Sequence, residues 1–142
     1  MPAVERLSVA CELLQQALRL YYEGGANYAC LHLAGAAEDV LGAYVEKHGG
    51  ESAFNNHRRA SVRLSAYFSA DGKASTEKAI GDVINFSKNR TKHGHGLVDF
   101  DPKEEARQLL DRAVSNYYQL MQIFPLSETD LKRRFNDDLA SV

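Results

Sequence analysis

The stretch ANYACLHLAGAAEDVLGAYVEK, residues 26–47, decides the fold class of this chain. Its apolar residues recur at steps of three and four and cover a wide arc, which is typical of a buried α-helix. Its many Ala and Gly residues leave room for a neighbouring helix to come close. The pairs Gly24-Gly25 and Gly49-Gly50 flank the stretch and should end helices there. We therefore place this helix at the centre of a helical bundle.

The same helical period continues on both sides of this stretch, and no segment alternates as a β-strand would. Asp101 is a typical N-cap, with Pro102 at the first helical position and Glu104-Glu105 in the first turn. We predict one domain, residues 1–142, that is an all-α antiparallel bundle of four main helices plus one or two short helices. The expected helices cover residues 4–22, 26–47, 53–68, 75–93 and 102–124, with a short final helix from Ser127.

The middle third of the chain supplies the remaining core side chains in this prediction. In residues 53–68 the side chains expected to face inward are Val62, Leu64, Tyr67 and Phe68. In the helix that follows they are Ala79, Ile80, Val83, Ile84 and Phe86. Both sets keep the spacing of an amphipathic helix, so we expect both helices to pack onto the bundle.

Composition excludes several classes of protein. Hydrophobic residues make up 44% and charged residues 25%, which is ordinary for a folded globular domain. The net charge is −2, so any binding of nucleic acid has to be local. Cys11 and Cys30 lie among Ala and Leu, which indicates buried thiols and not a disulfide framework. No apolar run is long enough to span a bilayer, and we therefore expect a cytoplasmic protein that does not enter membranes.

Residues 83–98, VINFSKNRTKHGHGLV, form a local positive pole because they contain no Asp or Glu. Their cationic or titratable side chains are Lys88, Arg90, Lys92, His93 and His95. If the helix continues through them, Asn85, Asn89 and His93 stack at four-residue steps, with two lysines beside them. An amide, an imidazole and two cations on one face can bind a phosphate and transfer a proton near neutral pH. We therefore predict a site for an anionic ligand at this helix end.

Two other interpretations of this stretch stay open. Lys, Arg and His are favoured in the last turn of a helix by its macrodipole, so these cations could be caps without function. His93 and His95, with Asp99 and Asp101 downstream, could be metal ligands, but no second cluster completes such a site. We predict no metal and no cofactor.

A second acid-free stretch, residues 52–70, contains Arg58, Arg59 and Arg63. These arginines could extend a nucleic-acid surface, or they could form an ordinary solvated helix face. The sequence leaves both interpretations open.

Three features resemble the HEPN (higher eukaryotes and prokaryotes nucleotide-binding) superfamily. They are the helical order, the acidic pair Glu38-Asp39 on an Ala-rich second helix, and the run Lys88-Asn89-x-x-x-His93. The resemblance covers roughly residues 4–124. Members of this family are small α-bundles that usually dimerise, and the active ones are metal-independent endoribonucleases. Their motif is an Arg, four to six residues and then a His, often with a polar residue straight after the Arg.

This chain fits the motif in two registers. In the first, Asn89 and His93 take the polar and His positions, and Lys88 stands in place of the Arg. In the second, Arg90 and His95 have the right spacing, but the His lies beyond a glycine and off the helix. We prefer the first register because its residues stay on the helix. A Lys, however, cannot make the planar bidentate phosphate contact of an Arg.

The resemblance implies a catalytic role for each group of this motif. His93 or His95 would act as general base or acid while an RNA 2′-hydroxyl attacks the adjacent phosphate. Arg90 or Lys88 would stabilise the charge that develops on the phosphoryl oxygens. Asn89 would position the phosphate.

Other polar groups would support this site. Lys92 and Asn85 would add contacts to a phosphate or another ligand, and Glu38 would raise the pKa of His93 if the two lie close together. Dimerisation would bring two motifs together across one cleft and double its positive potential.

Because Lys88 stands where the family has an Arg, we rank binding without cleavage above cleavage. The leading one is a HEPN-like homodimer that binds RNA, a nucleotide or another anionic ligand at residues 88–95 without cleaving it. The alternative is a metal-independent endoribonuclease of the toxin or defence type, with an antitoxin-like protein partner. The third is a helical protein-interaction adaptor that is not an enzyme.

Overall fold

The structure, a computed structural model, describes residues 3–92 and 96–141. All regular secondary structure in these two ranges is helical, which confirms the predicted all-α class. The seven helices found there are α1 (Arg6–Glu23), α2 (Asn27–Lys47), α3 (Ala53–Phe68), α4 (Glu77–Ile84), α5 (Phe86–Lys92), α6 (Pro102–Leu120) and α7 (Asp130–Ala140). None of these described helices combines the length and the apolarity needed to cross a membrane.

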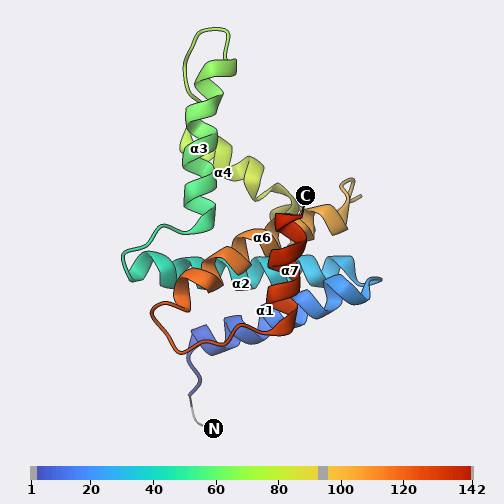
Figure 1. Cartoon of the computed structure of the whole chain (residues 1–142). Helices are drawn as coiled ribbons and strands as arrows, with labels where there is room; N and C mark the ends of the chain where they lie inside the picture. Colours follow the sequence, from blue (N-terminus) through green and yellow to red (C-terminus); the bar gives the residue numbers. More distant parts are fainter. Residues whose placement is uncertain (1–2, 93–95, 142) are drawn as a thin grey trace.

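The core lies between the three long helices α1, α2 and α6 (Figure 1). α2 is central, as predicted, because both α1 and α6 pack against it along its buried small residues Ala34, Gly35, Ala37 and Gly42. α7 packs on α1 and α6 and adds the ring of Phe135 to the core. α1 and α2 are antiparallel, since the chain reverses at Gly24-Gly25, where both φ angles are positive (76° and 85°).

α2 and α6 run in the same direction, which differs from the antiparallel order that the sequence predicted. The direction follows from contacts whose residue numbers rise together along both helices: Gly35 with Leu109, Glu38 with Arg112, and Gly42 with Asn116. Antiparallel neighbours can be joined by a short turn, whereas parallel neighbours need a longer connection that returns to the starting end. Residues 48–101 form that connection here.

The arm, which we define as residues 53–84, consists of α3, α4 and the turn between them. It projects from the body formed by α1, α2, α6 and α7 (Figure 1), and α3 has no buried residue along its fully described length. Side chains predicted to face the core are exposed instead: Leu64 55%, Tyr67 83%, Phe68 86%, Val83 73% and Phe86 51%. This prediction was wrong because helical period shows that a helix has an apolar face, not that the same chain covers it.

The single helix expected over residues 75–93 is divided at Asn85 into α4 and α5. Thr76 caps α4 by accepting a hydrogen bond from a first-turn backbone amide at 3.1 Å. Beyond Asn85 the chain turns, and Ser87 and Lys88 of α5 are buried against the body. The break lets α4 pack on α3 while α5 packs on α2.

The start of α6 is the one predicted, whereas α7 begins later than predicted. The Asp101 carboxylate accepts hydrogen bonds from two first-turn amides of α6 at 3.0 and 3.4 Å. The N-cap of α7 is Thr129 and not Ser127. The carbonyl of Ser127 instead accepts a 2.6 Å hydrogen bond from the hydroxyl of Tyr117, which ties the preceding loop to α6.

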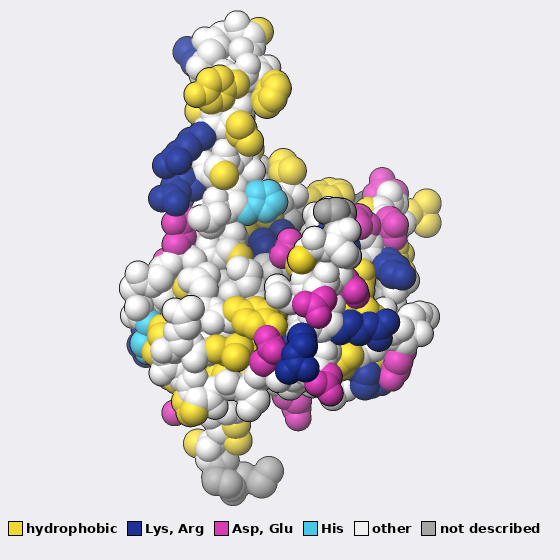
Figure 2. All heavy atoms as spheres, viewed as in Figure 1, with side chains coloured by type: hydrophobic (Ala, Val, Ile, Leu, Met, Phe, Trp, Pro, Cys, Tyr) yellow, Lys and Arg dark blue, Asp and Glu magenta, His cyan; other side chains and the backbone are white. Residues whose placement is uncertain are grey.

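Charge is distributed unevenly along the chain. Residues 52–98, which we call the cationic segment, contain eight Lys or Arg and three Asp or Glu, a formal net charge of +5. The remaining residues contain nine Lys or Arg and sixteen Asp or Glu, a formal net charge of −7. Figure 2 shows Lys and Arg side chains gathered along one side of the projecting arm. The near-neutral total therefore hides a positive segment in an otherwise acidic chain.

Candidate functional site

Lys88, predicted to contact a ligand, is turned inward from α5. Its side chain is only 7% exposed, and its Nζ lies 2.7 Å from Oδ1 of Asp39 on α2. The stem of Lys88 passes over Gly35, where a Cβ would come within 2.8 Å of the Lys88 Cδ. Gly35 therefore leaves the space in which the lysine lies. The ammonium holds α5 on α2 and is already paired with a carboxylate.

Glu38, predicted to support His93, is paired with Arg112 of α6. The Arg112 Nε and Nη2 donate to the two carboxylate oxygens of Glu38, each at 3.2 Å, and both side chains are buried. Burial raises the pKa of the Glu38 carboxyl, and the nearby charges of Arg112 and Lys88 oppose that rise. Two adjacent ion pairs therefore connect α5 to α2 and α2 to α6.

Of the remaining predicted site residues, only Asn85 and Asn89 have side chains that the structure describes. Asn85 and Asn89 are one helical turn apart, since the Asn89 amide donates to the Asn85 carbonyl at 3.0 Å. The Oδ1 atom of Asn85 is buried, whereas Asn89 is exposed to solvent. Arg90 and Lys92 belong to α5. His93 and His95 lie outside the described residues.

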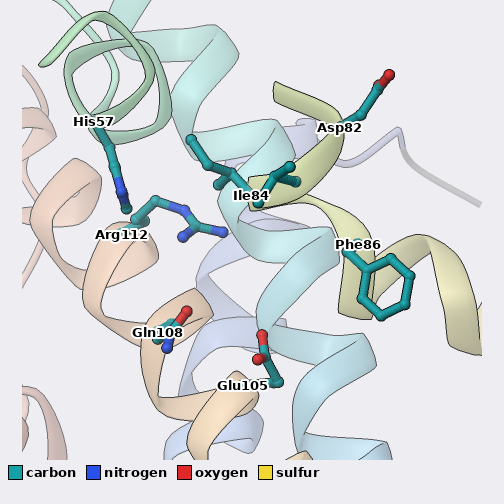
Figure 3. A pocket seen from close by; sticks show the side chains of 8 residues that line it. His57, Asp82, Ile84, Phe86, Glu105, Gln108 and Arg112 are labelled. Carbon is teal, nitrogen blue, oxygen red and sulfur yellow. The ribbon is translucent and has the colours of Figure 1, made fainter. Parts of the chain in front are cut away.

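A cleft of about 610 Å³ lies between the arm and α6 (Figure 3). One wall is apolar and comes from Val83, Ile84 and Phe86, and the other wall carries Glu105, Gln108 and Arg112 from α6. His57 reaches into the cleft from α3 toward α6 (Figure 3). Glu105 adds a carboxylate to the α6 wall, and Asp82 borders the cleft with its carboxylate pointing away from it (Figure 3), so the cleft is amphipathic and not a dedicated anion site.

Sequence reasoning missed Asp39, whose side chain is 54% exposed, as the partner of Lys88, and it missed two buried polar groups, Arg112 and Asn116. A signal for the last two was present, because both fall within the apolar arc of α6, whose buried residues include Leu109, Ala113, Val114 and Tyr117. A polar residue inside such an arc needs a partner on the facing helix. The acidic pair on α2 offers the matching signal, but the pairing between distant residues appears only in the structure.

A comparison of the chain with family models, with curated proteins and with solved structures finds no match. Any functional conclusion therefore depends on the residues, the charge distribution and the cavities of this chain itself.

Proposed function

We propose that this chain is a HEPN-like, cytoplasmic RNA-binding module in which RNA lies along the cationic segment, from the arm to the end of α5. The charge separation carries this proposal: residues 52–98 have a net charge of +5, whereas the rest of the chain has a net charge of −7. Such a pole attracts a polyanion, although the total charge of −2 would not. The segment contains both acid-free runs. Residues 52–70 carry the three arginines of α3, and residues 83–98 carry the motif that resembles the HEPN family.

Exposed aromatic rings on the arm favour single-stranded RNA over other polyanions. Tyr67 and Phe68 are almost fully exposed at the end of α3, and Arg63 is exposed one turn before them. Proteins that bind single strands combine cations along the backbone with aromatic rings on which bases stack. Stacking is tolerant of sequence, so this surface would supply affinity more than specificity.

Homodimerisation is the second part of the proposal. An isolated helix of the length of α3 is marginal in water, because most helical stability in proteins comes from packing an apolar face. Leu64 and Val83 are exposed on the arm, and a second copy that covers them would stabilise the arm. The resemblance to the HEPN family also implies a dimer.

The ion pair between Lys88 and Asp39 favours RNA binding without cleavage. Lys88 is engaged with Asp39 at 2.7 Å, so in the first motif register the cation that would contact the phosphate is occupied. The register formed by Arg90 and His95 is the remaining route to an endoribonuclease. Cleavage of RNA in EDTA that is abolished by His95→Ala and kept by His93→Ala would select that route.

The test measures affinity for a fluorescent mixed-sequence 12-mer RNA by anisotropy across a series of salt concentrations. Each phosphate contacted on a single strand contributes about −0.7 to the slope of log K against log salt. The double variant Arg63→Gln/Lys73→Gln, which removes two exposed cations without a carboxylate partner among the described residues, should therefore weaken binding and flatten the slope by up to about 1.4. Arg90→Gln/Lys92→Gln should act in the same direction.

The matched control replaces two exposed arginines of the acidic body, Arg107→Gln/Arg133→Gln, whose partners are Glu104 and Glu128. This control should leave both the affinity and the salt slope unchanged. Equal losses in the arm variant and the body variant would refute a localised RNA surface. If the unmodified protein does not bind RNA even at low salt, the RNA-binding proposal is refuted and the protein-interaction adaptor becomes the leading hypothesis.

A further inference from the structure

A small polar pocket lies apart from the cleft, where α2, the start of α3, the α4–α5 junction and α6 meet. Its volume is about 210 Å³. The side chains that matter for its chemistry are Asp39, Glu46, Phe54, Asn85 and Asn116, with Gly42 in its floor. Drug-sized ligands occupy pockets of roughly 300–1,000 Å³, so this pocket has room for one heterocycle and not for a whole nucleotide.

Two buried amide atoms that line this pocket have no hydrogen-bond partner in the described chain: Nδ2 of Asn116 and Oδ1 of Asn85. Asn116 is fully buried, with 0% exposure. Its Oδ1 accepts a 2.8 Å hydrogen bond from the Ala53 backbone amide, which fixes the orientation of the side chain and makes Nδ2 the free donor. Buried polar groups in folded proteins are nearly always paired. A free donor and a free acceptor in one cavity indicate a partner that offers both functions.

A carboxylate at the rim adds a third hydrogen-bonding group. Oε1 of Glu46 accepts from the Ser52 amide at 2.8 Å and from the Asn55 side chain at 2.6 Å. These hydrogen bonds lower the pKa of Glu46 and keep it ionised at neutral pH. The Glu46 side chain is exposed at the rim, so its other oxygen, Oε2, can accept from a ligand. The ring of Phe54 provides an apolar wall.

We propose that this pocket binds a guanine base, either as a free nucleotide or within the RNA of the proposed function. The pairing edge of guanine presents one acceptor, O6, beside two donors, N1–H and the N2 amino group. Asn116 Nδ2 matches O6, while Asn85 Oδ1 and Glu46 Oε2 match the two donors. Adenine and cytosine would instead place an amino donor against the Asn116 donor. Recognition of splayed bases by their edges is common in single-stranded RNA binding.

Gly42→Ala is the most informative variant for this pocket. A Cβ at position 42 would lie 3.4 Å from Asn116 Nδ2 and 3.4 Å from the Ser52 Cβ, which is ordinary van der Waals contact. The variant should therefore fold, and Ala also favours the helix over Gly. Its methyl group would cover the free donor. Gly81→Ala is the matched control, because it makes the same change in α4, and its Cβ would meet the Arg58 stem at 3.5 Å and the edge of the Phe54 ring at 3.6 Å but has none of the three hydrogen-bonding groups among its nearest contacts.

The experiment uses the full chain with guanosine and adenosine 5′-monophosphates, and with a 12-mer of uridine that does or does not carry one central guanosine. Binding is followed by calorimetry and by the side-chain amide signals of Asn116 and Asn85 in NMR spectra. We expect both amide signals to shift with the guanosine nucleotide alone. We also expect the preference for guanine to fall up to about tenfold in Gly42→Ala and in Glu46→Gln, because each variant loses one hydrogen bond to the base. Gly81→Ala should keep the preference.

Unshifted amide signals, which would mean that the two amides bind only ordered water, would overturn the guanine site. Equal affinity for the two nucleotides, or an unchanged preference in Gly42→Ala, would also overturn it. The guanine site and the RNA surface can fail separately. Salt-dependent binding of the uridine 12-mer without a gain from guanosine would refute only the pocket. Binding of the free guanosine nucleotide without binding of RNA would refute only the RNA surface.

Discussion

Replacing Arg112 with Met should be the most destabilising single change in the ion-pair system. The Arg112 and Glu38 side chains are 7% and 3% exposed and share two hydrogen bonds of 3.2 Å. Removing one partner of a buried pair leaves an uncompensated charge and costs about 3–5 kcal/mol. The neighbouring ammonium of Lys88 offsets part of that charge, so we expect about 3 kcal/mol, the lower end of this range.

Urea unfolding followed by circular dichroism measures this loss. With an m-value of about 1–3 kcal/mol/M for a small domain, a loss of about 3 kcal/mol lowers the midpoint by about 1–3 M. The double variant Glu38→Leu/Arg112→Met should recover most of the stability, because an apolar pair of similar volume removes the charge as well as the partner. A single variant that loses less than about 1 kcal/mol, or a double variant that equals the sum of the two singles, would refute this account of the pair.

The pH dependence of the Arg112→Met variant gives an independent check. Burial raises the folded-state pKa of Glu38 above 4.5, and loss of Arg112 raises it further. A raised carboxyl pKa contributes stability that is fully present below the unfolded pKa and is lost as the pH rises through the folded pKa. The difference in stability between the unmodified protein and the variant should therefore be largest at neutral pH, shrink as the pH falls through the raised pKa of Glu38 in the variant, and be small by about pH 4.5.

The remaining predictions concern the packing, the thiols and the dimer. Gly35→Ala should lower stability by about 1–3 kcal/mol in thermal melts, because the new methyl group displaces the stem of Lys88; an unchanged melting temperature would argue against that contact. Burial raises the pKa of the Cys30 thiol to about 11, so it should resist alkylation at pH 8 until urea unfolds the chain, and rapid labelling of the folded protein would contradict this. Leu64→Ser/Val83→Ser should shift sedimentation from dimer toward monomer; a monomer in the unmodified protein at every concentration would rule out the dimer.

The features that the sequence predicted correctly depend on residues close together in the chain. The acidic cap of α6 at Asp101 was recognisable because a cap, a proline and an acidic first turn follow each other directly. The central position of α2 followed in the same way from its wide apolar arc. These local signals were enough for the helical class and for most of the helix bounds.

The features that were missed depend on which distant residue lies opposite. Lys88 is in an acid-free stretch and was therefore predicted to contact an anionic ligand, yet its partner in the structure is Asp39, 49 residues away. The exposed position of Leu64 and Tyr67 was missed for a related reason, because an apolar face looks the same in a sequence whether the body or a second molecule covers it. Of the candidate site, the cationic stretch could be located from the sequence, but the inward turn of its lysine could not.

The separation of 74 residues between Glu38 and Arg112 sets the order in which the core can form. α1 and α2 are neighbours along the chain and can associate as a hairpin as soon as both leave the ribosome. The second side of α2 must wait for α6, which is synthesised only after the whole of residues 48–101. Closing so long a loop costs entropy, so this chain should fold more slowly than helical proteins whose contacts are local. During that interval the face of α2 that carries Gly35, Glu38 and Gly42 has no partner helix, which gives chaperones a window in which to bind the nascent protein.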